Sequence, residues 1–161
     1  MFKHKQLRQV VIQPALHLLD AYSVDAEELL IATCAIESDG GTYLVQTGLG
    51  SAKGIFQMEP ITHDDLWSRF LKNNPLLKNR LLITCGYQSP PRAETLVTNL
   101  LYASMMAYVL YMSRSPHHFP AQNDINAVWI HYKKYWNTYL GKTTKEKFLN
   151  AYYHFVGGHV S

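Results

Sequence analysis

The stretch LLIATCAIESDGG, residues 29–41, decides the fold. Its apolar residues follow one another with almost no polar interruption, so a helix here has no side suited to water and must lie inside the molecule. Gly40 and Gly41 are expected to end this helix, because glycine accepts the left-handed backbone of a helix C-terminus. The sequence therefore predicts one central buried helix that stops directly after an acid, Glu37.

The rest of the chain is expected to surround this helix with others, because apolar residues recur with a period near 3.6 and Pro- or Gly-rich stretches separate the segments. The 161 residues show no internal repeat and no linker. They predict a single domain, residues 1–161, of the mainly α class, with a short loop or β region after the central helix. Expected helices cover residues 6–21, a segment from about Asp25 with Glu28 as a variant capping box, a segment after Pro60 with Thr62 as its cap, a short piece at 73–79, and residues 93–113, 122–137 and 143–155.

Glu37 is the first candidate for chemistry. A carboxyl at the end of an apolar helix is partly removed from water, which disfavours its charged form and raises its pKa. The negative end of the helix dipole acts in the same direction. A carboxylic acid that is still protonated near neutral pH can donate a proton to a leaving oxygen, as cleavage of a glycosidic bond requires.

The second candidate is the stretch GIFQMEP, residues 54–60. Gly54 permits close approach of the backbone, and Gln57 offers an amide that suits the N-acetyl group of an amino sugar. Phe56 and Met58 are then wall or core residues. The residues alone fit equally well a tight connection into the next helix.

The composition limits the chemical classes of partner that the chain is expected to bind. A net charge of +3 suits an anionic partner such as bacterial cell wall, whereas the scattered basic residues lack a nucleic-acid-binding signature. Cys34 and Cys85 form no Cys-x-x-Cys pair and the pair His117–His118 has no neighbouring ligands, so we expect no metal and no cofactor.

No apolar run is long enough to insert into a membrane. No signal peptide is expected either, so synthesis in a cytoplasm is predicted, with delivery by other means.

The stretch AIES, residues 35–38, followed by GIFQMEPITH, residues 54–63, resembles the lytic transglycosylases of the lysozyme-like superfamily. The match is closest to small phage-encoded members, which also carry a late segment like YKKYWNTYLGK, residues 132–142. The resemblance covers about residues 12 to 150. It implies a lysozyme-like helical fold and an enzyme that cleaves peptidoglycan glycan strands in the periplasm or cell wall. A phage-encoded member is expected to reach the wall either as a virion component, beside other phage virion proteins, or by release at lysis.

The resemblance also implies roles for single residues. Glu37 matches the acid/base of the family, and Ser38 matches the serine that orients it. Gln57 matches the glutamine that contacts substrate, and Met58 the backbone position beside it.

The late motif of the family supplies a tyrosine that donates a hydrogen bond to the glutamic acid, directly before an asparagine. Here Trp136 precedes Asn137, which departs from that pattern. Tyr132 or Tyr135 must then supply the hydroxyl. Trp136, beside Lys134 and Asn137, is the candidate for stacking on a sugar ring.

Two mechanisms remain open. A lytic transglycosylase needs one carboxyl, which protonates the glycosidic oxygen and then accepts the proton of the C6 hydroxyl. A hydrolytic muramidase usually needs a second carboxylate, about 5–10 Å from the first, and Glu59 is the main candidate. A virion structural or ejection protein with a lysozyme-like fold and weak activity is the other alternative, and a basic domain that binds nucleic acid ranks last.

Overall fold

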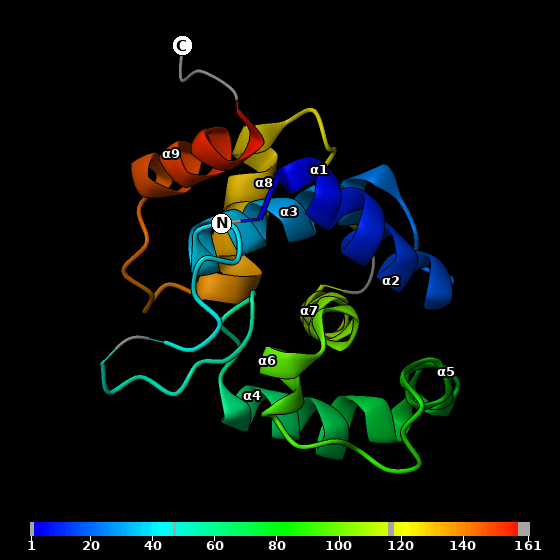
Figure 1. Ribbon diagram of the computed structural model, residues 1–161. Helices are drawn as coiled ribbons and strands as arrows, with labels where there is room; N and C mark the ends of the chain where they lie inside the picture. The colour runs from blue at the N-terminus through cyan, green and yellow to red at the C-terminus, as the bar shows by residue number, and fades with distance from the viewer. Residues whose placement is uncertain (1, 47, 116–117, 158–161) are drawn as a thin grey trace.

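The computed structural model describes residues 2–46, 48–115 and 118–157, and it is mainly helical. Figure 1 shows the arrangement of the helices along the chain. The elements are α1 (His4–Gln6), the π-helical segment η1 (Leu7–Ile12), α2 (Gln13–Leu18), α3 (Val24–Ser38), α4 (Pro60–Asp65), the π-helical η2 (Leu66–Phe70), the 3-10 turn η3 (Leu71–Asn73), α5 (Pro75–Cys85), α6 (Thr95–Thr98), α7 (Leu100–Arg114), α8 (Ile125–Tyr132), the π-helical η4 (Lys133–Asn137) and α9 (Lys145–Val156).

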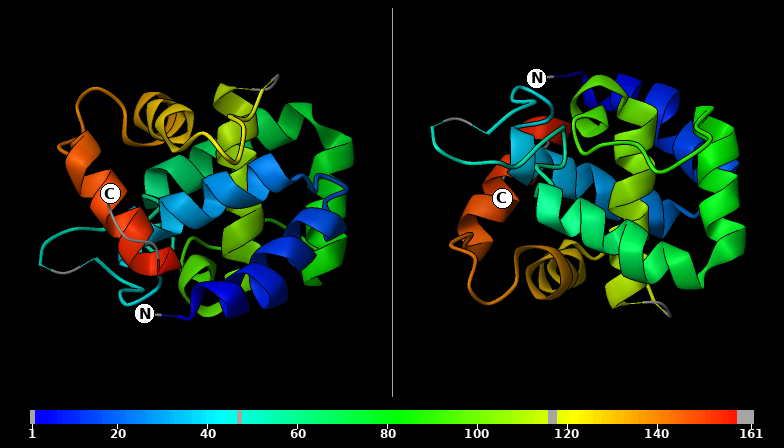
Figure 2. Two further views of the ribbon diagram at one scale, coloured as in Figure 1. Left: turned by 90° about the horizontal axis from the view of Figure 1, so that it is seen from above. Right: turned by 90° about the horizontal axis from the view of Figure 1, so that it is seen from below.

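The predicted central helix is confirmed as α3. It runs through the middle of the molecule, with α7 crossing it steeply and α9 lying against its C-terminal part (Figures 1 and 2). The side chains of residues 26–35 are all buried. Because neighbours surround this helix on every side, its sequence needs no polar stripe.

The start of α3 differs from the expectation. Ser23 caps the helix, since its hydroxyl accepts a hydrogen bond from the Ala26 N–H at 3.0 Å. Asp25 lies inside the first turn, and its carboxylate accepts a hydrogen bond from the Gln122 N–H at 2.8 Å. The predicted capping box with Asp25 and Glu28 is therefore wrong, because both acids have partners far away in the sequence.

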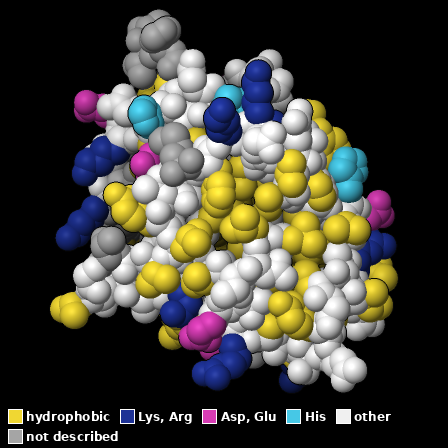
Figure 3. All heavy atoms as spheres, in the orientation of Figure 1, with side chains coloured by type: hydrophobic (Ala, Val, Ile, Leu, Met, Phe, Trp, Pro, Cys, Tyr) yellow, Lys and Arg dark blue, Asp and Glu magenta, His cyan; other side chains and the backbone are white. Residues whose placement is uncertain are grey.

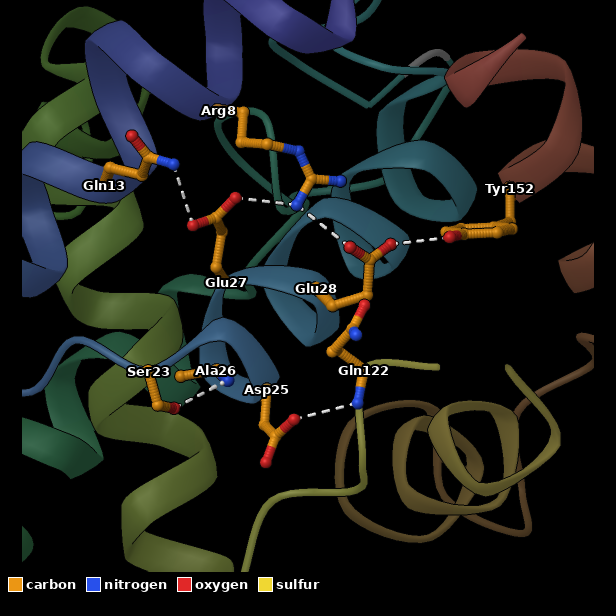
Figure 4. A network of polar contacts seen from close by, with 9 residues as sticks. All are labelled: Arg8, Gln13, Ser23, Asp25, Ala26, Glu27, Glu28, Gln122 and Tyr152. Carbon is orange, nitrogen blue, oxygen red and sulfur yellow. Dashed lines mark hydrogen bonds and ion pairs between the residues drawn. The ribbon is translucent and has the colours of Figure 1, made fainter. Parts of the chain in front are cut away.

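Glu27 and Glu28, in the N-terminal half of α3, belong to a network of polar contacts with Arg8, Gln13 and Tyr152, called here the Arg8 clasp (Figure 4). The Arg8 guanidinium contacts Glu27 at 2.7 Å and Glu28 at 2.9 Å. Gln13 donates to Glu27 at 3.0 Å, and the Tyr152 hydroxyl donates to Glu28 at 2.6 Å. Both carboxylates are nearly fully buried, so these bonds replace the water that burial removes. The clasp joins η1, α2 and α9 to the central helix.

The end of α3 is shaped by three consecutive residues with positive φ. Asp39 already adopts the left-handed conformation, with φ of 51°, and the predicted Gly40 and Gly41 follow at 60° and 84°. A Cβ at Gly40 would lie 2.4 Å from the Phe155 ring, and one at Gly41 would lie 2.2 Å from the Phe2 ring. Glycine is therefore required twice here, for the turn and for the two aromatic rings that pack on it.

The loop after α3 carries only traces of β structure. Among the residues that the structure describes, the β pairing is limited to isolated bridges between Val45 and Lys53 and between Lys53 and Met58. The loop runs into α4, whose N-cap position is Glu59. The predicted cap, Thr62, is wrong because Thr62 lies inside the helix, which begins at Pro60, a residue suited to the first turn.

The predicted helix 93–113 is interrupted. Asn99 has an extended backbone, and its side chain accepts a hydrogen bond from the Tyr102 N–H at 2.9 Å, which starts α7 afresh after α6. Of the helices in the described ranges, none combines the length and the apolar character needed to cross a membrane.

Gly54 provides a test of how closely the loop after α3 packs against α6. Its φ is +75°, and a Cβ there would lie 2.3 Å from the Leu96 carbonyl oxygen of α6. Gly54→Ala is expected to lower the free energy of unfolding by about 2–5 kcal/mol, because backbone strain adds to a clash with another backbone. Gly86→Ala is the matched control, with φ of +73° and no atom within 4 Å of the added Cβ. Urea denaturation measures the free energy of unfolding of both variants. Equal losses of that free energy would contradict the close packing of this loop against α6.

Candidate active site

Glu37 lies in the last turn of α3 and faces a cavity of about 270 Å³. The cavity forms where the helix end meets the loop that follows it, so one rigid helix and one strained loop build its walls. Most of the wall is polar, which suits a ligand rich in hydroxyl and amide groups. The other lining residues are Tyr43, Gln46, Ala52, Gln57 and Glu59.

The Glu37 carboxyl has one fixed partner. The Tyr132 hydroxyl, from the end of α8, donates a hydrogen bond to Glu37 Oε1 at 2.7 Å. Burial raises the pKa of Glu37 to about 7, and the bond from Tyr132 counteracts part of that rise. Of the two tyrosines that the sequence left open, Tyr132 therefore reaches the acid. The carboxyl can exist in both protonation states near neutral pH.

Gln57 shares the cavity with Glu37, as the motif predicted that it would lie near the acid. Its backbone φ is 47°, an unusual value for a residue with a side chain. The side-chain amide donates to the Gly54 carbonyl oxygen at 2.9 Å. This bond holds the amide in the turn and fixes its position beside the cavity.

Ser38 and Met58, the two other residues that the resemblance assigned to the site, are both buried. Ser38 is fully buried, and its hydroxyl donates to the Ile55 carbonyl oxygen at 2.6 Å and accepts from the Gly41 N–H at 2.9 Å. Met58 is buried too, and its backbone pairs with Lys53 in both directions, at 2.9 and 3.0 Å. Both residues hold the loop against the end of α3, and Met58 also lines a small hollow beside Gln57.

Two other residues of the late motif, Tyr135 and Asn137, lie outside the Glu37 cavity. Tyr135 turns away from Glu37, toward a different hollow that includes Phe119 and His131. Asn137 is occupied internally, since it accepts from Lys133 at 2.7 Å and donates to Thr143 at 3.3 Å. Neither is among the residues that line the Glu37 cavity.

Trp136 does lie near the cavity. Its ring packs against Tyr111 and Phe56, with centroids 5.2 and 6.3 Å away. It lines a small hollow that also includes Gln57 and Glu59, two residues of the Glu37 cavity. The late motif thus contributes two residues to the site, Tyr132 behind the acid and Trp136 beside it.

The sequence did not point to Tyr43 and Gln46. Both come from the exposed loop after α3, where no periodicity marks which side chains face inward. Gln46 pairs with Ala52 through its backbone N–H, at 3.1 Å, and through its side-chain oxygen, at 3.2 Å. Cross-loop pairing of this kind depends on the three-dimensional path of the loop, so only the structure could show it.

Figure 3 shows Lys and Arg side chains scattered around the edge of one face, with hydrophobic side chains between them. Within residues 2–46, 48–115 and 118–157, no three His, Cys, Asp or Glu side chains are placed to hold a metal ion. His117, of the histidine pair noted in the sequence, lies outside these described residues.

Comparisons with known proteins add no relative. No protein-family model matches the chain, and searches of curated proteins and of solved structures found no match. The functional argument therefore rests on the residues and the geometry of the site.

Proposed function

We propose that the protein cleaves the glycan strands of peptidoglycan between N-acetylmuramic acid and N-acetylglucosamine, with Glu37 as both acid and base. One observation carries the proposal: a carboxyl with a pKa raised to about 7, bonded to a buried tyrosine, faces a polar cavity beside an amide. A single group with this pKa can donate a proton and take one back at neutral pH. The resemblance of the two sequence motifs to lytic transglycosylases supports the same activity.

The proposed reaction needs no water. Glu37 donates its proton to the glycosidic oxygen, and the bond between that oxygen and C1 of the muramic acid breaks. The C6 hydroxyl of the same sugar then bonds to C1 and passes its proton to the Glu37 carboxylate, which leaves a 1,6-anhydro ring. The Tyr132 hydroxyl stabilises the carboxylate that exists between the two steps. In this proposal, Gln57 binds the N-acetyl group.

Hydrolysis is the second candidate, and Glu59 favours it. This carboxylate lines the same cavity as Glu37 and accepts a hydrogen bond from the Ser51 hydroxyl. A second carboxylate could activate a water that attacks C1 in place of the C6 hydroxyl. The products would then carry a reducing end and weigh one water more than anhydro products.

We place the reaction in the bacterial cell wall, during phage infection or at lysis. A virion could carry the protein to the wall, or a holin could release it from the cytoplasm. The mild positive charge of the chain suits the anionic wall polymer.

Glu37→Gln tests the proposed acid. Turnover of purified sacculi should fall by about 100- to 10,000-fold, because general acid–base catalysis is lost. Mass spectrometry of the wild-type products should show anhydro ends. Glu146→Gln, an exposed acid in the first turn of α9, should leave the rate unchanged. Wild-type turnover by Glu37→Gln would refute the assignment.

The same variant has a predicted effect on stability. The pKa of Glu37 in the folded protein, about 7, lies above its ordinary value of 4.5, so folding favours the protonated form. The stabilisation of the folded state by protonated Glu37 is complete below pH 4.5 and is lost as the pH rises through 7. Thermal unfolding of Glu37→Gln should therefore match the wild type at pH 4 and occur at a higher temperature at pH 8. A lower unfolding temperature at pH 8 would contradict the burial of this carboxyl.

Tyr132→Phe tests the hydrogen bond to the acid. The bond lowers the pKa of Glu37, so its removal should move the alkaline limb of the kcat/KM profile upward by about one to two pH units. Tyr139→Phe, at a tyrosine that is 88% exposed, is the control and should keep the wild-type profile. An unshifted limb in Tyr132→Phe would show that the bond does not set this pKa.

Glu59→Gln separates the two mechanisms. In the transglycosylase reaction this variant should keep most of the activity, within about tenfold, and still release anhydro products, because only one carboxyl takes part. If instead the wild type releases hydrated products and Glu59→Gln abolishes them, the protein is a hydrolase. The measurement is product mass together with the rate of release.

A further inference from the structure

A second hollow adjoins the Glu37 cavity and has a different character. Its volume is about 90 Å³, and it shares Gln57 and Glu59 with the larger cavity. Trp136 and Arg114 are among its other lining residues. Because two residues belong to both hollows, a ligand bound in the first lies directly beside the second.

Arg114 lines this hollow as an exposed residue, and one hydrogen bond holds its guanidinium. Arg114 is the last residue of α7, and its Nη1 donates to the Tyr135 carbonyl oxygen at 2.6 Å. This bond uses one of the five N–H donors of the guanidinium. The Trp136 ring, held between Tyr111 and Phe56, stands beside it as a rigid apolar wall. The cation therefore has a defined place and donors to spare.

Nearby acids have other partners. Asp65 forms an ion pair with Arg69 at 2.8 Å, and Glu59 accepts the hydrogen bond from Ser51. In the parts of the chain that the structure describes, no carboxylate lies within ion-pair distance of Arg114. A guanidinium in a hollow next to a binding cavity, without a carboxylate of its own, suits a carboxylate of a ligand, since its planar fork matches that group.

We propose that Arg114 binds the carboxylate carried by the muramic acid side group, and thereby makes the protein select cell-wall glycan over uncharged chitin-type glycan. That carboxylate belongs to the lactyl group in a bare strand and to the peptide in a substituted strand. The inference rests on the proposed function, since it names the substrate carboxylate that the same site binds. Arg114 acts in recognition, while Glu37 carries out the chemistry.

Calorimetric binding tests this without turnover, in the Glu37→Gln background. The three ligands are chitotetraose, a bare GlcNAc–MurNAc tetrasaccharide and the same tetrasaccharide carrying its peptides. Adding Arg114→Gln should weaken binding of one or both carboxylate ligands by about 10- to 100-fold, the loss expected for a charge-assisted hydrogen bond. Chitotetraose should change less than twofold. The carboxylate ligand that loses affinity identifies the source of the bound group.

Lys72→Gln, which removes an exposed positive charge from η3, is the matched control and should leave all three affinities unchanged. Equal weakening for all three ligands, or no weakening, would overturn the role of Arg114 while leaving the proposed function intact. If the protein that carries only Glu37→Gln binds none of the ligands and the wild type leaves sacculi intact, both proposals fail.

A salt series keeps the test decisive if Arg114→Gln does not fold. With Arg114 in place, affinity for a carboxylate ligand should fall as NaCl rises from 0.05 to 0.5 M, because salt screens the attraction. Affinity for chitotetraose should stay nearly constant. Equal salt dependence for all ligands would overturn the proposal.

Discussion

The burial of α3 on every side is the constraint on which the rest of the structure depends. Helices from both halves of the chain pack around it, and the Arg8 clasp joins the N-terminal segment and α9 to its first half. The last turn of this helix meets the loop that follows it, and there Glu37 is only partly exposed to water. The same burial that stabilises the core raises the pKa of this carboxyl. Stability and the proposed chemistry thus share one cause.

The sequence predicted the parts of the site that depend on local pattern. An apolar run without a polar stripe indicated the central helix, and its end indicated Glu37. The choice between Tyr132 and Tyr135 could not be made, because residues three apart lie on nearly the same face of an α-helix. The π-helical segment η4 begins at Lys133 and changes that spacing. Tyr132 consequently reaches Glu37, whereas Tyr135 faces another hollow.

The predictions that failed share a physical reason, which is competition from distant partners. Asp25 and Glu28 have the spacing of a helix cap, yet Gln122 and Tyr152 bind them from the other end of the chain. Such partners are set by the packing of whole elements. A local pattern names a residue that can form a bond, and tertiary structure decides with which group it forms.

The two acids of the cavity occupy contrasting settings, and this contrast bears on the proposed reaction. Glu37 is held by a buried tyrosine on a rigid helix, whereas Glu59 is exposed and bonded to Ser51 within the loop. The base of that loop is fixed, because Gly54 touches the backbone of α6 and Lys53 pairs with Met58. In the proposed reaction, proton donation by Glu37 serves transglycosylation and hydrolysis equally. Whether water or the C6 hydroxyl of the sugar then attacks would depend on what the loop holds beside Glu59, so the proposal makes the loop, rather than α3, the element that determines the product.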